Sequence, residues 1–502
     1  MNILLGNIPT EIPLENGTER YFVKAGSRWP FAGIKRREEQ PQYIPFPFYL
    51  GFLAALLVRE KFNVQVLDGY ALNLTIDEFV NECLIHHPDI LLFETTTPTV
   101  ERDLQAVLKI KSECPSTLII VTGAHATLEF KEILKEPTIN YVIRGEYEAT
   151  ALELVKAISL DNLYPELPGL CYEKNDKEYF GEPELIADLN WLPLPEYRLF
   201  PSNQHADINV YWDGFCQKRP AIQMLSSRGC PFLCNFCLWN EVIYQHGKYR
   251  FFSAQRLVND IEYIRDNFFV KEYYFDDDTF TGNRKKVHDF CDEIMKRNIK
   301  ISWSAMCDFM GSDEDLIRHM ARAGCIGIKF GVESSDATVL KNINKPINLD
   351  KIKRLTALCQ DLGIKTHATF TFGLLGDTQQ SMVQTLDFAK KLSTESVQFS
   401  INTPFPGTTY YKLLFRENRI SFQDYTEFDG ASNSVVDYVD LDRQDVLDIH
   451  NRAKSEWFRY QLKKPDWIWR QLKISVRILR GQGIIAFLRL VKQLFYYVFS
   501  NV

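Results

Sequence analysis

Two runs of apolar segments that alternate with amphipathic segments constrain the fold of this chain more than any other sequence feature. The strand-like segments of the first run are residues 2–5, 64–68, 90–93, 118–122 and 141–143, with helical patterns between them. Strands that alternate with helices form a parallel sheet covered on both faces. Residues 1–157 are therefore predicted to be a doubly wound, Rossmann-like α/β domain, with any ligand at the carboxyl edge of its sheet.

The second run predicts a barrel that is not complete. Its strand-like segments are residues 221–226, 272–275, 299–306, 326–332, 365–372 and 396–402. Because a full barrel needs eight βα units, we expect a partial (β/α)6 TIM-type barrel over residues 216–425, with its chemistry at the carboxyl ends of the strands. A Pro-rich linker is predicted over residues 158–215, and a helical carboxyl-terminal region over residues 426–502.

Charge and cysteine usage limit the classes of function. The net charge is −7; residues 463–502 hold eight basic residues and one acidic residue, a charge of +7, which leaves −14 for residues 1–462. An acidic body disfavours nucleic acid as a partner, because phosphate binding needs clustered cations.

The eleven cysteines are an odd number, and the first residues lack a signal-peptide pattern. We therefore expect a cytoplasmic protein whose clustered cysteines serve a metal or catalysis.

One cysteine cluster follows the first strand of the barrel. Residues 229–237 read GCPFLCNFC, which spaces Cys230, Cys234 and Cys237 as CxxxCxxC. Three thiolates on one loop suit an iron–sulfur cluster, and the lack of a fourth nearby cysteine would leave one iron open. The alternative is a zinc site completed by Cys216 or by a distant histidine.

At these residues the chain resembles the radical S-adenosylmethionine (SAM) superfamily. The resemblance implies that Cys230, Cys234 and Cys237 hold a 4Fe-4S cluster whose open iron binds SAM. It also implies that a flavodoxin- or ferredoxin-type donor supplies the electron that cleaves SAM to a 5′-deoxyadenosyl radical. The aromatic residue that the family has before the last cysteine is present as Phe236.

Further segments resemble the SAM pocket of this superfamily. The acidic segment YFDDDTF at 274–280 offers Asp277 and Asp278, which could alternatively cap the following helix or turn. The segment GIKFGVES at 327–334 offers Gly331 for close cofactor approach and Glu333 and Ser334 as polar contacts.

Two later segments complete the resemblance. The segment TFGLLG at 371–376 contributes Gly373, although Leu375 stands where relatives have proline. The segment PFPGT at 404–408 contributes Pro406, and it reads equally well as an ordinary turn.

The amino-terminal domain resembles that of the cobalamin-binding subclass of these enzymes. The candidate cofactor contacts at the carboxyl edge of its sheet are Thr95, Gly123, His125 and Gly145. The fold alone would also allow a nucleotide site or an empty scaffold. Because the DxHxxG motif of methionine-synthase-like domains is absent, His125 is not expected to bind cobalt. The resemblance then implies that the lower face of the cobalt is bare or water-bound. Residues 25–30 could be a lid over this edge or a surface connection.

The resemblance leaves several reactions open. Cobalamin-dependent methylation of an unactivated carbon is the first hypothesis. The alternatives are a cobalamin-dependent radical rearrangement, cyclisation or oxidation of a lipid, isoprenoid or tetrapyrrole, and a sensor of metal or cobalamin without turnover. The substrate is expected to be a small or lipid-like molecule.

The tail of the chain has two interpretations. Ile468, Leu472, Val476 and Leu479 recur at helical spacing opposite basic residues. Such a helix could lie on an anionic membrane, which would give a peripheral membrane association, or it could pack on the barrel.

Overall fold

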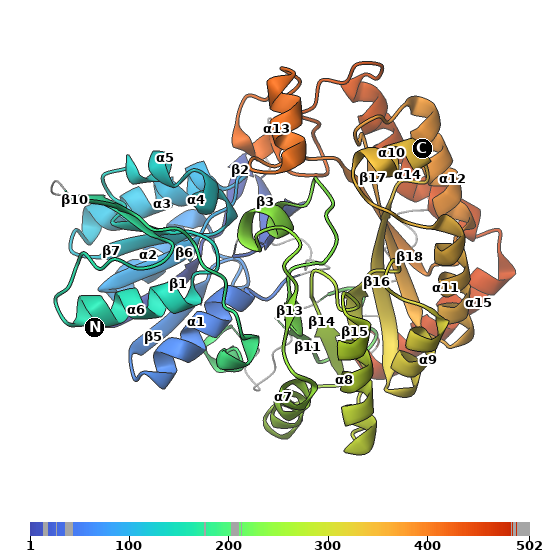
Figure 1. The fold of residues 1–502 in the computed structure, drawn as a ribbon, viewed down its shortest axis with the longest axis horizontal. Coiled ribbons are helices and arrows are strands. Elements are labelled where there is room, and N and C mark those ends of the chain that lie inside the picture. The colour runs from blue at the N-terminus through green and yellow to red at the C-terminus, as the bar shows by residue number, and fades with distance from the viewer. Residues whose placement is uncertain are drawn as a thin grey trace.

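The computed structural model describes the chain except for residues 14–18, 27, 36–43, 175–176, 202–209, 212, 483, 485–487 and 489–502. Two α/β units lie side by side, with the amino-terminal unit drawn in blue and cyan and the second in green to orange (Figure 1). The predicted α/β architecture, with a Rossmann-like domain followed by a barrel-type domain and a helical carboxyl-terminal region, is confirmed.

A seven-stranded sheet forms the amino-terminal unit, in the order β10-β9-β8-β7-β6-β1-β5. Its strands are β1 (Asn2–Asn7), β5 (Asn63–Asp68), β6 (Ile90–Glu94), β7 (Leu118–Thr122), β8 (Tyr141–Ile143), β9 (Leu170–Lys174) and β10 (Lys177–Phe180). Its helices are α1 (Phe48–Arg59), α2 (Ile76–His86), α3 (Val100–Glu113), α4 (Ala124–Leu128), α5 (Phe130–Leu134) and α6 (Glu148–Ser159). The antiparallel pair β9 and β10 falls in the predicted linker and instead extends this sheet.

Six parallel strands form the second unit in sequence order, β11-β14-β15-β16-β17-β18. They are β11 (Ala221–Met224), β14 (Glu272–Phe275), β15 (Trp303–Cys307), β16 (Cys325–Glu333), β17 (Lys365–Phe372) and β18 (Ser396–Ile401). Their helices are α7 (Ala254–Asn267), α8 (Arg284–Lys296), α9 (Glu314–Arg322), α10 (Ala337–Asn342), α11 (Leu349–Asp361), α12 (Gln379–Lys391) and α13 (Thr409–Arg416). The two edge strands β11 and β18 do not pair, which is the expected partial barrel.

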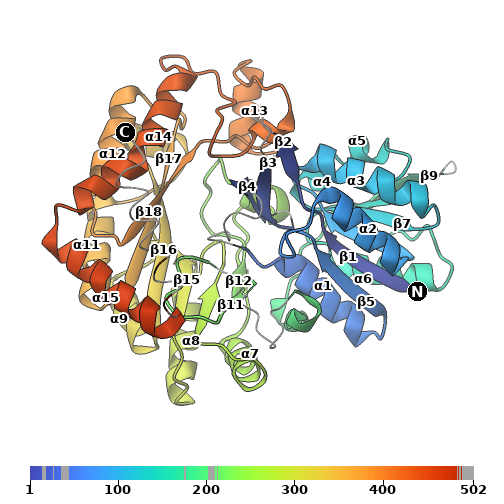
Figure 2. The same cartoon turned by 180° about the vertical axis from the view of Figure 1, so that it is seen from behind.

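Short elements that the sequence pattern did not predict lie between the two units. A small sheet joins β2 (Glu11–Pro13), β3 (Glu19–Ala25) and β4 (Arg28–Lys35), and Figures 1 and 2 place it between the two larger sheets. A second small sheet pairs β12 (Ser227–Arg228) with β13 (Arg250–Phe251) around the cysteine loop. Of residues 25–30, considered above as a lid, the described ones belong to the β3–β4 hairpin: Ala25 ends β3 and Arg28 begins β4.

The carboxyl-terminal region is helical, as predicted, and lies on the barrel. It contains α14 (Arg443–Gln461) and α15 (Pro465–Gln482). Figures 1 and 2 show both helices on the side of the barrel away from the amino-terminal unit. Among the described residues, no helix is both long and apolar enough to cross a membrane.

Candidate functional site

The cysteine loop begins where β12 ends, at the carboxyl end of β11. Gly229 begins it with a φ of +81°, and a side-chain carbon at this position would come within 2.0 Å of the carbonyl oxygen of Lys248. Only glycine fits such a turn beside a neighbouring backbone. The loop then carries Cys230, Cys234 and Cys237 as free, partly buried thiols.

Hydrogen bonds from the far side of the barrel mouth fix the course of this loop. The Asn235 side chain donates to the carbonyl of Asn342 (2.8 Å), and the Asn344 side chain donates to the carbonyl of Leu233 (2.7 Å). The backbone N–H of Tyr410 on α13 donates to the carbonyl of Asn235 (2.9 Å). The loop is therefore held in place by segments that follow β16 and β18.

The structure disfavours Cys216 as a fourth ligand that would make the three thiols a zinc site. Burial raises the pKa of Cys237 to about 12 and also raises the pKa of Cys230 and of Cys234, so the metal-free thiols stay protonated and a metal must displace the protons. Cys216, considered as a zinc ligand, is buried before β11, at the opposite end of that strand from the loop. Among the residues that the structure describes, no group of three or more His, Cys, Asp or Glu side chains is arranged so that it could hold one metal ion.

The acidic segment after β14 supports the start of this loop. The carboxylate of Asp277 accepts from the N–H groups of Ser226 (2.7 Å) and Ser227 (3.1 Å) and from the Ser226 hydroxyl, while the Lys286 ammonium lies 3.6 Å away. Asp278 accepts from the N–H of Gly229 (3.1 Å). Asp277 is fully buried in these contacts and caps no helix, so it anchors the loop. Asp278 is partly exposed, and its charge contributes, after burial, to the raised pKa of Cys230 and of Cys237.

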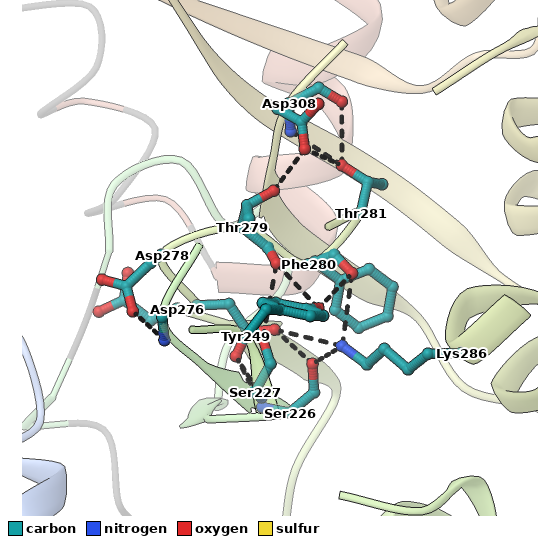
Figure 3. Close-up of polar contacts among 12 residues, drawn as sticks. Ser226, Ser227, Tyr249, Asp276, Asp278, Thr279, Phe280, Thr281, Lys286 and Asp308 are labelled. Atoms are coloured by element: carbon teal, nitrogen blue, oxygen red, sulfur yellow. Dashed lines mark hydrogen bonds and ion pairs between the residues drawn. The ribbon is translucent and has the colours of Figure 1, made fainter. Parts of the chain in front are cut away.

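Asp308 forms a second polar group beside the cysteine loop, one that sequence reasoning missed. Its carboxylate accepts from the hydroxyls of Thr279 (2.6 Å) and Thr281 (3.0 Å), as Figure 3 shows. The Asp308 charge also contributes to the raised pKa of Cys230, after burial. A lone Asp after a strand gave no sequence signal for this role.

Glu333 lies at the end of β16, where the backbone is strained. Its φ is +68°, and its carboxylate accepts from Lys345 (2.7 Å) and from the Thr371 hydroxyl (2.9 Å). A side-chain carbon at Gly331 would come within 2.3 Å of this carboxylate, so glycine leaves the space that Glu333 occupies. Burial raises the pKa of Cys234, whereas the nearby Lys345 ammonium lowers it. The pair of Glu333 and Lys345 is thus next to the cysteines, and Lys345 was not predicted.

Ser334 points away from this pair. Its hydroxyl lies 3.2 Å from the Thr385 hydroxyl of α12 and accepts from the N–H of Asp336 (3.1 Å). These contacts hold the turn after β16 and do not support the expected contact with SAM.

The two later segments close the barrel mouth. Gly373 has a φ of +76°, and its carbonyl accepts from the Asn402 side chain (3.1 Å). Pro406 is buried. The adjacent Gly407 has a φ of +90°, and a side-chain carbon there would come within 2.5 Å of Leu128 on α4. The segment at 404–408 therefore contacts the amino-terminal unit.

The carboxyl edge of the amino-terminal sheet faces the barrel. Gly123, with a φ of +105°, precedes α4. His125 is buried, its Nδ1 lies 3.1 Å from the Thr97 hydroxyl, and Tyr425 covers its ring edge-on at 5.3 Å. Burial lowers the pKa of His125 to about 4, so the ring is neutral at pH 7. These contacts agree with a packed histidine rather than a metal ligand.

Thr95 and Gly145 occupy supporting positions at the same edge. The hydroxyl of Thr95 donates to the buried carboxylate of Asp103 (2.8 Å), which also pairs with Lys24 of β3 (2.9 Å). The N–H of Gly145 donates to the Thr127 hydroxyl (2.9 Å), and Gly145 has a φ of +72°. The Thr95 hydroxyl is bonded to Asp103 and Gly145 has no side chain, so direct contact of either residue with a cofactor remains a prediction.

A buried ion-pair cluster joins this edge to the cysteine loop. Arg228, two residues before Cys230, contacts Glu146 (3.4 Å) and Glu148, and all three side chains are fully buried. Arg250, the cross-strand partner of Arg228, binds both carboxylate oxygens of Glu146 at 2.7 Å. Burial opposes ionisation of Glu146, but Arg228 and Arg250 outweigh it and lower the pKa of Glu146. The loop and the sheet edge are therefore fixed relative to each other.

The same interface offers hydrogen-bond donors for a polar cofactor. Within the described residues, the buried Nε atoms of Arg228 and Arg250 and the Nε1 of Trp239 have no acceptor. Buried donors in proteins are normally paired, so an unpaired group needs an explanation. Three such donors between the sheet edge and the cysteine loop suit a cofactor with peripheral carbonyl groups, as cobalamin has.

Comparisons with known proteins agree with both halves of this site. Residues 224–389 match the radical SAM superfamily model, and residues 41–155 match the B12 binding domain model. The chain is 31% identical over 390 residues to an uncharacterized methyltransferase of Pyrococcus horikoshii, covering 76% of this chain and 82% of that protein. It is 26% identical to the anaerobic magnesium-protoporphyrin IX monomethyl ester cyclase of Rubrivivax gelatinosus, covering 83% of this chain and 74% of the cyclase.

A solved structure has the same fold along the whole chain. The cobalamin-dependent SAM radical enzyme OxsB, with aqua-cobalamin and SAM bound, superposes with a TM-score of 0.66 at 16% identity, covering 100% of this chain and 73% of OxsB. The cysteine loop, the sheet edge that faces it and the sequence relatives lead to one conclusion. The chain belongs to the cobalamin-binding radical SAM enzymes, whose cofactors are a 4Fe-4S cluster, SAM and cobalamin.

Proposed function

We propose that this protein methylates an unactivated carbon atom of its substrate. The observation that carries the proposal is the buried contact of Arg228 with Glu146 and Glu148, which fixes the cysteine loop opposite the carboxyl edge of the amino-terminal sheet. When bound, the cluster with SAM supplies a carbon radical and cobalamin supplies a transferable methyl group. Both groups must reach one substrate carbon, so a rigid interface between their sites favours transfer.

The residues of the chain have separate roles in this proposal. Cys230, Cys234 and Cys237 hold the cluster. Glu333, which accepts from Lys345 and Thr371, would also accept from the SAM ammonium group, and Asp278, which accepts from the N–H of Gly229, would be a second acceptor.

The test is transfer of a labelled methyl group. Reduced, cofactor-loaded protein would be given SAM with a trideuterated methyl group and a small-molecule and lipid extract of host cells. We expect 5′-deoxyadenosine together with a product that carries the label. If 5′-deoxyadenosine forms but no product carries the label, the reaction is instead a rearrangement, cyclisation or oxidation, the alternative for which the similarity to a cyclase provides support.

Cobalamin is expected to bind without a histidine on its lower face. After loading with hydroxocobalamin and reduction to the paramagnetic Co(II) form, electron paramagnetic resonance should show no nitrogen coupling from a lower ligand. The reason is that His125 is occupied by Thr97 and covered by Tyr425. His125→Ala should give the same spectrum as the parent protein. A nitrogen coupling that disappears in this variant would contradict the assignment.

We also propose an electron donor and a class of substrate for this protein. A flavodoxin- or ferredoxin-type protein would supply the electron, and a small or lipid-like molecule would be the substrate. We also propose peripheral contact with a membrane through the carboxyl-terminal helix α15.

A further inference from the structure

The last described helix, α15, packs on the barrel along one face. Trp467 is buried between Trp457 and Phe458 of α14, with ring centroids 5.9 and 5.7 Å away. Arg470 pairs with Glu395, just before β18, at 3.0 Å, and Ile474 is buried one turn further along. This face anchors the helix, so the interpretation of the tail as a packed element holds for one side of α15.

The other face of α15 is apolar and exposed. Its members are Ile468 (38% exposed), Trp469 (60%), Leu472 (52%), Val476 (45%) and Leu479 (38%), which we call the outer stripe. Successive helical residues turn by about 100°, so these positions fall within roughly a third of the circumference. The anchoring residues Trp467, Arg470 and Ile474 fall on the remaining part. A continuous exposed apolar face of this kind marks an interaction surface.

The charge near the outer stripe shows which surface it fits. From Lys463 to Val502 the sequence has eight basic residues and one acidic residue, whereas residues 1–462 carry −14. Lys473 is exposed, and its ammonium lies 5.7 Å from the Trp469 ring. An acidic protein body would be repelled by an anionic surface, but this cationic, apolar end would be attracted to it.

We propose that the outer stripe of α15 docks the protein peripherally on an anionic lipid surface. Tryptophan and lysine are suited to the interface between headgroups and acyl chains, where an apolar body and a charged tip are both satisfied. Further along the chain, Ile484 and Leu488 are also exposed, at 58% and 56%. This proposal does not depend on which reaction the site performs.

The position of α15 restricts what such docking does. Arg470 contacts Glu395 at the amino-terminal end of β18, whereas the cysteine loop lies at the carboxyl end of the parallel strand β11. The docked face is therefore at the end of the barrel away from the cluster. Docking would hold the enzyme at the membrane and leave the cluster side free for an electron donor, so it does not by itself imply a lipid substrate.

The test is flotation of the full-length protein with vesicles. We expect it to float with vesicles of equal parts phosphatidylglycerol and phosphatidylcholine, and to float much less with phosphatidylcholine alone. Leu472→Glu combined with Val476→Glu should reduce binding to the anionic vesicles by at least about tenfold, because it removes apolar contact and adds repulsion. Circular dichroism and thermal unfolding of this variant should match the parent, since both side chains point away from the barrel.

A matched control uses exposed apolar residues of the amino-terminal unit. Ile85→Glu combined with Leu160→Glu changes side chains that are 69% and 81% exposed, and it should leave vesicle binding unchanged. The proposal is overturned if the parent protein does not float with anionic vesicles, or if the α15 variant floats as well as the parent. It is also overturned if the parent is a dimer that the α15 variant dissociates, because the outer stripe would then be an interface between two copies of this chain.

Discussion

Replacing any one of Cys230, Cys234 and Cys237 with alanine is expected to abolish the iron–sulfur cluster and with it the cleavage of SAM. The three residues are the free thiols of one loop whose course is fixed by Gly229 and by bonds from Asn235. Because the loop supplies all the protein ligands of the cluster, two thiolates cannot hold it stably. After anaerobic reconstitution, iron content should fall from about four atoms per chain to near zero. The visible absorption and 5′-deoxyadenosine formation should fall to background.

Cys216→Ala is the matched control for this experiment. Cys216 is a buried thiol at the opposite end of β11 and packs against Phe215 and Tyr274. The variant should retain the cluster, although it loses some stability because a small buried side chain is removed. Stoichiometric zinc in the parent protein, together with no iron-dependent absorption, would contradict the assignment. A requirement for Cys216 in holding the metal would restore the zinc alternative.

Arg228→Ala is expected to have the largest effect on stability among single changes outside the cysteine loop. The variant would leave Glu148 as a buried carboxylate without its cation, whereas Glu146 would keep only Arg250. Breaking a buried ion pair by removing one partner costs about 3–5 kcal/mol. The Arg228 guanidinium also lies 4.3 Å from the ring of Tyr49 on α1, and this contact would be lost as well. Denaturant unfolding, followed by probes in each unit, should show a destabilised first transition and earlier proteolytic cleavage between the units.

The control for this change is an exposed ion pair within the amino-terminal unit. Lys109 and Asp77 lie 2.7 Å apart, but their side chains are 56% and 76% exposed, so Lys109→Ala should change stability by less than about 1 kcal/mol. Arg228→Lys should lie between the two, because lysine restores the charge but not the planar fork that reaches two carboxylates. An Arg228→Ala protein with the unfolding profile of the parent would show that the contact does not hold the units together.

Local sequence patterns were sufficient for the main architecture and the cluster. Each parallel strand of the two large sheets is a short apolar segment between helical patterns, and this periodicity depends on residues close together in the chain. Cys230, Cys234 and Cys237 could be assigned for the same reason, since their spacing lies within eight residues of one loop. The β3–β4 hairpin and the strands β9 and β10 were not predicted, because the hairpin depends on its place between the units (Figure 1) and β9 and β10 depend on pairing with the distant strand β8 rather than on a local pattern.

The roles of the polar residues depended on contacts that join distant parts of the chain. Asp277 was predicted to line the SAM pocket, but the structure uses it to bind the N–H groups of Ser226 and Ser227, about fifty residues earlier. Lys345 gave no signal in the sequence, because its importance comes only from its proximity to Glu333 and the cysteines. Hydrogen-bond partners of this kind follow from the fold and have no sequence periodicity of their own.

The sequence by itself determined the two α/β units, the cysteine loop and the amphipathic character of the tail, because each is encoded by nearby residues. Only the tertiary structure decided that Arg228 joins the loop to Glu146 and Glu148, since these residues are far apart in the chain and meet only when the units pack.

The tertiary structure also decided the role of α15. Its sequence allowed either packing or an exposed apolar face, and the fold gives it both: Trp467 is buried on α14, while Leu472 and Val476 face outward. The physical reason is that a helix has more apolar surface than one packing partner can cover.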